Sequence, residues 1–130
     1  MRKEKIHSAA APAAIGPYVQ ANAFGNLVFT SGQLPTDPAT GAFAGEGIEA
    51  QTERSLNNIA AVLEAAGSSM KNVLKTTVFL SDIDHFAAMN AVYARFFDAD
   101  APPARSAVEV ARLPKGALVE IEAVAYRDGA

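Results

Sequence analysis

The sequence contains no cysteine and no tryptophan, and it has only two histidines. The absence of cysteine excludes disulfides, thiolate nucleophiles and cysteine-based metal sites. His7 and His85 have no second ligand at metal-binding spacing, so we expect no metal site. No GxSxG turn supports a serine nucleophile with a triad. Because no other cofactor motif is present either, we expect the protein to act without a cofactor.

Long apolar runs and basic clusters are also missing from the chain. No stretch approaches the roughly 20 apolar residues that a membrane-spanning helix needs, and the N-terminal residues form no apolar signal core. We therefore expect a cytoplasmic protein with no membrane partner. The net charge is −3, and the longest basic cluster is Arg2, Lys3 and Lys5. This charge pattern argues against a nucleic-acid partner.

Half of the 130 residues are apolar, and no linker or internal repeat interrupts the chain. We therefore expect a single domain over residues 1–130, long enough to bury a core of its own. Three glycines occur in the run at 33–47, but no Lys-Ser or Lys-Thr pair follows them. We interpret this run as a loop rather than as a phosphate-binding turn.

Hydrophobic spacing predicts two strands, a helix, a strand, a second helix and two final strands. Gly25-Asn26 is typical of a hairpin between the first two strands. Gly67 marks the end of the first helix, and Ser81–Asp84 resembles a capping box that begins the second. The expected elements are strands at 18–20 and 27–31, a helix over 48–66, a strand over 73–80, a helix after 82, and two strands within 102–125.

This order of elements predicts an α+β fold with a mixed β-sheet and both helices packed on one face. Alternation within the 73–80 strand places Leu74 with Val78 and Leu80 on one side, and Val73 with Phe79 on the other. Several strands carry apolar side chains on both sides. Because two helices cover only one face, the other face needs a partner, and we expect a homo-oligomer.

The segment from Pro102 to Ala125 contains the residues most suited to chemistry. Arg105 follows two prolines that stiffen its approach, and a rigid guanidinium fork suits bidentate binding of a carboxylate. Glu120 and Glu122 alternate with apolar residues in the second expected strand. A carboxylate there is costly in a buried sheet unless it is paired or used. The plain alternatives are a surface ion pair for Arg105 and a solvated strand face for the glutamates.

We expect the two strands of this segment to be adjacent and antiparallel, joined by a turn at Pro114-Lys115-Gly116. In that register Arg105 and Glu120 are roughly 13–20 Å apart, too far for one small ligand to bridge. If both residues serve one site, they come from different subunits, and the site lies at an interface. Asn90 lies on or beside the apolar stripe of the second helix. A polar side chain in such a place more often bonds to the backbone than to a substrate.

Several blocks of the sequence, in order, resemble the RidA/YjgF family of imine deaminases. The resemblance extends essentially from end to end. It rests on APAAIGPYVQ (11–20), TSGQLP (30–35), EAAGSS (64–69), VLKTTVFLSD (73–82), the helix pattern with Phe86, Asn90, Tyr93, Phe96 and Phe97, and PARSAVEVARLPKGALVEIEA (103–123).

The resemblance implies a chorismate-mutase-like homotrimer with three sites in the clefts between subunits. It also implies hydrolysis of reactive 2-imino acids, which pyridoxal-phosphate enzymes release, to 2-keto acids and ammonia. The implied activity is that of a 2-iminobutanoate/2-iminopropanoate deaminase, a hydrolase of C=N bonds that detoxifies reactive intermediates. Its partners would be a small 2-imino or 2-keto acid and further copies of the chain.

The resemblance also assigns roles to particular residues. Arg105 would hold the substrate carboxylate, and Glu120 would activate water and move protons to the departing ammonia. The pocket residues would be Tyr18, Ser31, Gly32, Asn90 and Ala107, the last at a position where many family members have cysteine. Hydrolysis of an imine in this scheme uses no thiol.

Two other functions remain open at the level of the sequence. One is an endoribonuclease or translation inhibitor, an activity also attributed to the family. The acidic charge balance and the lack of paired histidines argue against it. The other is a non-catalytic protein that binds small carboxylates or acts like a chaperone. Replacement of Glu120 would distinguish this second alternative from a deaminase, because binding alone does not need a general acid and base.

Overall fold

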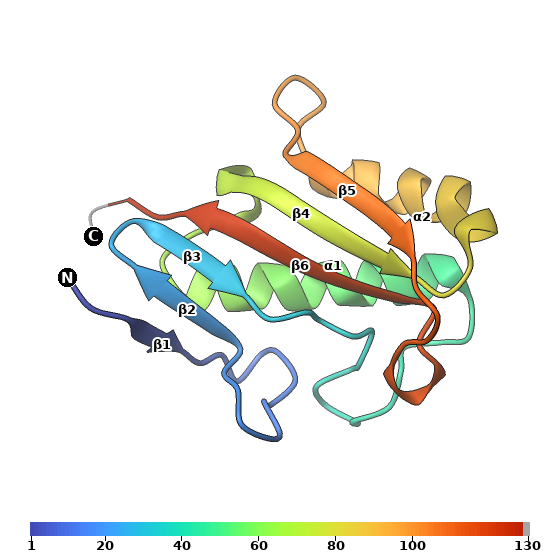
Figure 1. Ribbon diagram of the computed structural model, residues 1–130, viewed down its shortest axis with the longest axis horizontal. Coiled ribbons are helices and arrows are strands. Elements are labelled where there is room, and N and C mark those ends of the chain that lie inside the picture. Colours follow the sequence, from blue (N-terminus) through green and yellow to red (C-terminus); the bar gives the residue numbers. More distant parts are fainter. Residues whose placement is uncertain (129–130) are drawn as a thin grey trace.

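A computed structural model describes residues 1–128 of the chain as one mixed sheet and two α-helices (Figure 1). Short 3₁₀ turns precede or follow several of these elements, at Met70–Asn72, Ile83–His85, Ala94–Phe96 and Pro114–Gly116. The strands are β1 (Glu4–Ile6), β2 (Ala21–Phe24), β3 (Leu27–Thr30), β4 (Val73–Leu80), β5 (Ala104–Glu109) and β6 (Val119–Tyr126), and the helices are α1 (Ile48–Ala65) and α2 (Phe86–Tyr93).

The six strands lie in the order β1-β2-β3-β6-β4-β5. β4 and β5 are parallel because α2 connects them, and every other pair is antiparallel. The prediction that β5 and β6 form a hairpin is therefore wrong, since β4 lies between them. β4 pairs with both strands over most of its length, and the turn at Pro114–Gly116 leads the chain past β4 instead of back along β5.

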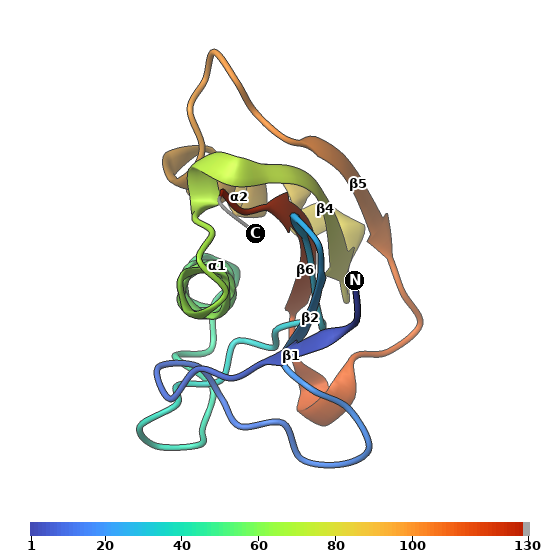
Figure 2. The same ribbon diagram turned by 90° about the vertical axis from the view of Figure 1, so that its left-hand side faces the viewer.

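Both helices cover the same side of the curved sheet, as the sequence predicted (Figure 2). α1 packs against β6 and against α2. The core lies between the helices and the sheet. Every second side chain along each strand points into it. Its largest fully buried members are Leu56, Ile59, Leu63, Leu80, Met89 and Ile121. We call the side covered by α1 and α2 the helix face and the other side the open face.

Two local predictions need correction. β2 begins at Ala21, so the predicted strand at residues 18–20 is a loop, although the hairpin at Gly25-Asn26 is confirmed. Gly25 adopts φ +60, which glycine tolerates without strain. A β-bulge between Val73 and Lys75 shifts the pairing of β4 with β6. As a result Val73 is buried together with Val78 and Leu80, while Leu74 is exposed.

The expected end of α1 at Gly67 is confirmed, but the expected capping box at Ser81–Asp84 caps the 3₁₀ turn Ile83–His85 and not α2, whose N-cap His85 makes no side-chain capping bond. Gly67, with φ +82, follows the last turn of α1. The Asp82 carboxylate accepts a hydrogen bond from the Asp84 backbone N–H at 2.9 Å, and α2 itself begins four residues after Asp82, at Phe86. Neither helix in the described part of the chain is long and apolar enough to cross a membrane.

Candidate functional site

Arg105 on β5 points toward α2, where three side chains hold its guanidinium. Nη1 donates a hydrogen bond to Asn90 Oδ1 at 2.6 Å. The Cζ atom lies 4.7 Å from the ring centroid of Tyr93 and 5.3 Å from that of Phe86. One amide oxygen and two aromatic faces therefore fix the plane of the guanidinium without neutralising its charge.

The helix positions of these three side chains explain why they meet Arg105. Phe86, Asn90 and Tyr93 are spaced four and three residues apart, so they lie along one side of α2. The Tyr93 hydroxyl is 2.6 Å from Thr76 Oγ1 on β4, next to Arg105 in the sheet register. Burial raises the pKa of the Tyr93 phenol, although its bond to Thr76 and the charge of Arg105 act in the opposite direction. The phenol therefore stays neutral at physiological pH.

A cavity of about 360 Å³ opens beside this guanidinium. Asn90, Tyr93 and Arg105 line one part of it, and Pro102 and Pro103 line another. Among residues 1–128, no carboxylate lies within salt-bridge distance of Arg105. Asp98 also lines the cavity but forms no ion pair with Arg105. A guanidinium without a paired carboxylate can bind an anion such as a substrate carboxylate.

Glu120 occupies the other candidate half of the site, on the open face of β6. Its neighbours Val119 and Ile121 are fully buried on the helix face, so alternation places Glu120 and Glu122 on the opposite side. The Glu120 carboxylate packs directly against Gly32. A Cβ atom at Gly32 would lie 2.8 Å from Glu120 Cδ and 2.9 Å from its Oε2. Any larger residue at position 32 would push the carboxylate aside.

The surroundings of Glu120 make it a better proton carrier than an exposed glutamate. Burial raises the pKa of its carboxyl group above the ordinary value, and the negative charge of Glu122 raises it further. A carboxyl group with a raised pKa can take up and release protons closer to neutral pH.

Tyr18 and Ser31 lie at the edge of the open face, close to Gly32 in the chain. The Ser31 hydroxyl donates to the carbonyl oxygen of Val19 at 2.6 Å, and the Ser31 backbone N–H donates to the carbonyl of Gln20 at 2.9 Å. The Tyr18 hydroxyl accepts a hydrogen bond from the Ile15 backbone N–H at 3.3 Å, and its side chain is about half exposed. The two Ser31 bonds tie the loop before β2 to the loop after β3, close to Gly32 and Glu120.

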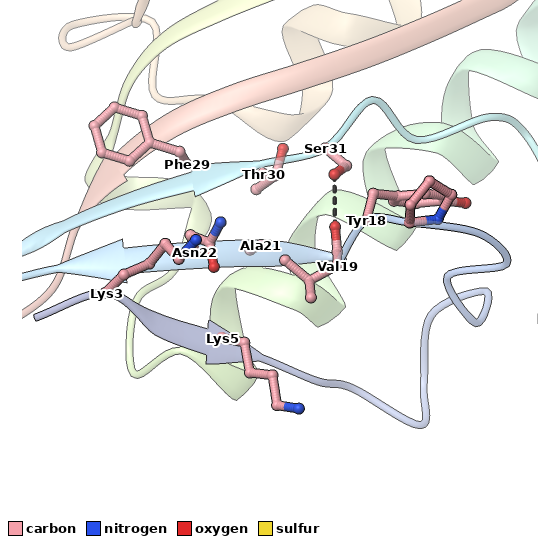
Figure 3. A pocket seen from close by; sticks show the side chains of 10 residues that line it. Lys3, Lys5, Tyr18, Val19, Ala21, Asn22, Phe29, Thr30 and Ser31 are labelled. Atoms are coloured by element: carbon pink, nitrogen blue, oxygen red, sulfur yellow. Dashed lines mark hydrogen bonds between the residues drawn. The ribbon is translucent and has the colours of Figure 1, made fainter.

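Two further cavities meet at Tyr18. One, of about 510 Å³, is lined by Tyr18, Gly32 and Lys115 among others. The other, of about 650 Å³, extends from Tyr18 and Ser31 to Lys5 on β1 and to Lys3 just before it (Figure 3). Both contain residues that the sequence assigned to the site, although Glu120 itself lines neither cavity.

The two halves do not come together within one chain. Arg105 pairs with Thr76 on β4, which pairs with Ala123, so Arg105 and Glu120 are two strands and three residues apart. This separation corresponds to about 14 Å between their Cα atoms. The distance agrees with the sequence-based estimate, although β4 rather than a hairpin turn separates the strands. Moreover, Arg105 lies on the helix face and Glu120 on the open face.

The remaining predicted residue, Ala107, lies two residues after Arg105 and is paired with Val78 in the sheet. It is partly buried and packs against the core, on the same side as Arg105. Sequence reasoning treated Phe86 and Tyr93 only as core residues and missed that they flank Arg105. Their spacing with Asn90 along α2 was the available signal.

No group of three or more His, Asp or Glu side chains within residues 1–128 is arranged as metal ligands are.

Comparison with known proteins identifies the chain's relatives. The family described as Endoribonuclease L-PSP matches residues 8–127. A 2-iminobutanoate/2-iminopropanoate deaminase of Salmonella typhimurium is 55% identical over 119 residues, covering 90% of this chain and 92% of the relative. A RutC family protein of Pyrococcus abyssi is 50% identical over 128 residues, covering 98% of this chain and 100% of the relative.

Solved structures give the same result. The YjgF gene product of Escherichia coli has a TM-score of 0.90 and 48% identity, with 95% of this chain and 98% of the other covered. Escherichia coli TdcF with bound serine has a TM-score of 0.90 and 46% identity, with 96% and 99% covered. A match over nearly the whole chain, at about half identity, leaves one conclusion: this protein is a member of the RidA/YjgF family, whose family description is Endoribonuclease L-PSP.

Proposed function

We propose that the protein hydrolyses 2-imino acids to 2-keto acids and ammonia. The observation that carries this proposal is the state of Arg105, whose guanidinium is oriented by Asn90, Phe86 and Tyr93 but carries no counter-charge within the described residues. Such a group matches the carboxylate that every 2-imino acid contains. Relatives more than half identical to this chain carry the name of that deaminase, which supports the same reaction.

In the proposed reaction, Arg105 binds the substrate carboxylate and holds C2 of the imine beside Glu120. The Glu120 carboxylate accepts a proton from water as the water oxygen bonds to C2, and it passes this proton to the imine nitrogen to give a carbinolamine. Glu120 then moves the hydroxyl proton of the carbinolamine to the same nitrogen as the C=O bond forms and the C–N bond breaks. The balance is one imine plus one water to one ketone plus one ammonia. General acid–base catalysis of this kind contributes roughly 10²–10⁴-fold, and positioning adds to it.

We further propose that each site is built by two copies of the chain, one giving Arg105 and its neighbour giving Glu120, Tyr18, Ser31 and Gly32. The two halves lie on opposite faces and about 14 Å apart in one chain, so a small acid cannot touch both. The open face also exposes large apolar side chains that a second copy would cover. They are Phe24, Leu27, Phe29, Val108 and Tyr126.

A closed ring of three copies, as in the chorismate-mutase-like assembly implied by the family resemblance, satisfies this requirement. Each copy in such a ring uses one surface toward its predecessor and another toward its successor. Every Arg105 half then meets a Glu120 half, and no half-site is left over.

The activity can be tested with 2-iminobutanoate, generated in solution from threonine by a threonine dehydratase. Its lifetime is measured by competition with semicarbazide, in the presence of the wild type, Arg105→Ala or the control Arg112→Ala. Arg112 is exposed and lines none of the three cavities described above. We expect Arg105→Ala to lose about 100-fold or more in kcat/KM, because a bidentate ion pair is removed, and Arg112→Ala to match the wild type. Equal decay with the wild type and Arg105→Ala would contradict the proposal.

Glu120→Gln separates catalysis from simple binding. The amide keeps the shape of the carboxylate but cannot take a proton from water. We therefore expect it to retain binding of 2-ketobutanoate, measured by calorimetry, while turnover is lost. Full turnover by Glu120→Gln would favour the non-catalytic interpretation of this residue. RNA cleavage, the activity named in the family description, can be assayed with the same variants.

A further inference from the structure

Tyr93 and Thr76 form a closed pair of hydroxyl groups behind Arg105. The Tyr93 phenol oxygen is 2.6 Å from Thr76 Oγ1, and the two residues are 6% and 1% exposed. Within residues 1–128, this bond is the sole hydrogen bond of either hydroxyl group. Because both side chains are buried, water cannot replace a partner that is lost. Each hydroxyl group therefore depends on the other.

The same bond ties α2 to the sheet. α2 has only eight residues and is flanked by 3₁₀ turns, and a helix of this length depends on tertiary contacts for its position. Two side-chain hydrogen bonds join α2 to the sheet within the described residues, from Tyr93 to Thr76 and from Asn90 to Arg105. Only the first is independent of Arg105. Thr76 is thus a tether that places α2 before Arg105 packs on it.

The tether also fixes the ring of Tyr93. The Arg105 Cζ atom lies 4.7 Å from the ring centroid, and the Phe97 ring packs against Tyr93 with a centroid separation of 4.7 Å. Thr76 holds the phenol end of the ring and is the neighbour of Arg105 in the sheet register. The ring cannot tilt or slide without losing at least one of these three contacts.

The position of this ring decides which plane the guanidinium presents. A guanidinium has five N–H donors, and the Asn90 amide oxygen accepts a bond from Nη1 of Arg105. Contacts with aromatic faces hold the guanidinium plane without using any donor. A bidentate carboxylate needs two parallel N–H groups in one plane. Tyr93 therefore orients Arg105 while leaving donors free for a substrate.

We propose that Thr76 is a positioning residue for substrate binding: its hydroxyl group fixes the Tyr93 ring, and the ring fixes the plane of the Arg105 guanidinium. This inference rests on the proposed function, in which Arg105 binds the carboxylate of the 2-imino acid. Thr76 itself lines none of the three cavities, so it acts only through Tyr93.

Four variants test this role. Thr76→Val keeps the shape of the side chain but leaves the buried phenol without a partner, whereas Thr76→Ser retains the hydroxyl group. Tyr93→Phe keeps the ring and removes the phenol oxygen. The combination of Thr76→Val with Tyr93→Phe leaves two apolar groups of matching shape and no unpaired hydroxyl group.

Thr52→Val is the matched control. Thr52 is another fully buried threonine, on α1, and its hydroxyl group has no hydrogen-bond partner among the described residues. It lines none of the three cavities. The same chemical change at this position therefore removes no bond and leaves the Arg105 half of the site untouched.

The measurements are the Kd of 2-ketobutanoate by calorimetry and the KM and kcat for 2-iminobutanoate, all well below the unfolding midpoint of each variant. We expect Thr76→Val to raise Kd and KM by about tenfold, because the unpaired phenol turns toward another partner and moves the ring from Arg105. kcat should change by less than about twofold, since the carboxylate is held equally in substrate and transition state. Thr76→Ser and Thr52→Val should match the wild type.

The combined variant separates positioning from a general effect on packing. Tyr93→Phe alone should raise Kd by less than about threefold, because the ring remains beside Arg105. Adding Tyr93→Phe to Thr76→Val should restore Kd to that level, since no buried phenol is left to turn away. A tenfold loss that the second change does not restore would show that Thr76 does not act through Tyr93. Equal Kd values for the wild type and Thr76→Val would also overturn the proposal.

Failure of this inference and failure of the proposed function give different results. If the wild type hydrolyses 2-iminobutanoate and Thr76→Val matches it in Kd and KM, the positioning role falls and the deaminase stands. If the wild type binds 2-ketobutanoate but hydrolyses no imine, the deaminase falls, and the calorimetric comparison of the same variants still decides the role of Thr76. A wild type that neither binds the keto acid nor hydrolyses the imine overturns both.

Discussion

Glu120 and Glu122 lie two residues apart on β6 and face the same side of the sheet, so the charge of Glu122 acts on the carboxyl group of Glu120. Burial and the charge of Glu122 both raise the pKa of Glu120. If Glu120 acts as a base, activity falls when pH drops through this raised pKa. The lower pH limit of activity therefore reports on Glu122 as well as on Glu120.

Replacement of Glu122 by glutamine should move that limit. The substitution removes a neighbouring negative charge, so the pKa of Glu120 falls toward its ordinary value. We expect the acid limb of kcat/KM for 2-iminobutanoate to shift to lower pH, with little change near neutrality. A pH–rate profile of the wild type and Glu122→Gln measures the shift, and Glu109→Gln, an exposed glutamate on β5, is the control. An unchanged or rising acid limit would contradict this interpretation.

The raised pKa also has a consequence for folding. A carboxyl group whose pKa is higher in the folded state adds stability below its unfolded pKa, and this contribution is lost as pH rises through the folded value. Ionised Glu120 therefore does not favour folding at neutral pH.

The residue types of the site could be predicted from the sequence, but their environments could not. Two prolines before an arginine indicated a rigidly presented fork, and alternation placed Glu120 on one strand face. The bond between Arg105 and Asn90 joins residues on different elements, and its existence depends on how α2 crosses β5. The close approach of Glu120 to Gly32 depends equally on how the chain leaves β3.

At the scale of elements, α1 holds the loop that follows Gly32. Asn58, fully buried on α1, donates from its amide nitrogen to the carbonyl oxygens of Leu34 at 3.1 Å and Thr36 at 2.9 Å. Its amide oxygen accepts a bond from Arg54 Nε at 3.1 Å. One helix residue thus fixes the loop whose first residues lie against Glu120.

Asn58→Ala should therefore weaken both the fold and the site. Two loop carbonyls lose their donor, at a cost of about 1–3 kcal/mol in the free energy of unfolding. We expect a lower urea midpoint and a reduced kcat for imine hydrolysis, because the loop beside Glu120 is released. Asn72→Ala, which changes an asparagine in the turn before β4, is the matched control. An Asn58→Ala protein with wild-type stability would show that the loop does not depend on this amide.

The elements themselves were largely predictable, because long periodic segments specify their own structure. The helix over 48–66 and the strand over 73–80 are confirmed to within one residue. The hairpin prediction for β5 and β6 failed because local turn signals do not reveal which strand inserts between two others. The misplacement of Leu74 had a similar cause, since the bulge in β4 arises from its pairing with β6.

At the scale of the whole molecule, the proposed site requires that two copies of the chain meet. Arg105→Ala and Glu120→Gln should each be inactive alone. If they are denatured together in equal amounts and refolded, random mixing gives about a quarter of the interfaces both wild-type residues. We expect about a quarter of the wild-type activity to return. Each variant refolded alone is the control, and a mixture that stays inactive would place both residues in one chain's site.

β6 is the last strand within residues 1–128, and it occupies the middle of the sheet between β3 and β4. The strands made first, β1 to β3, have no direct pairing with β4 and β5. During synthesis, before β6 is available, β1–β3 form one group of strands and β4–β5 form another. Each group then has an unpaired edge where β6 will later bind. The sheet closes only after β6 has left the ribosome, so the exposed strand edges must be tolerated until then.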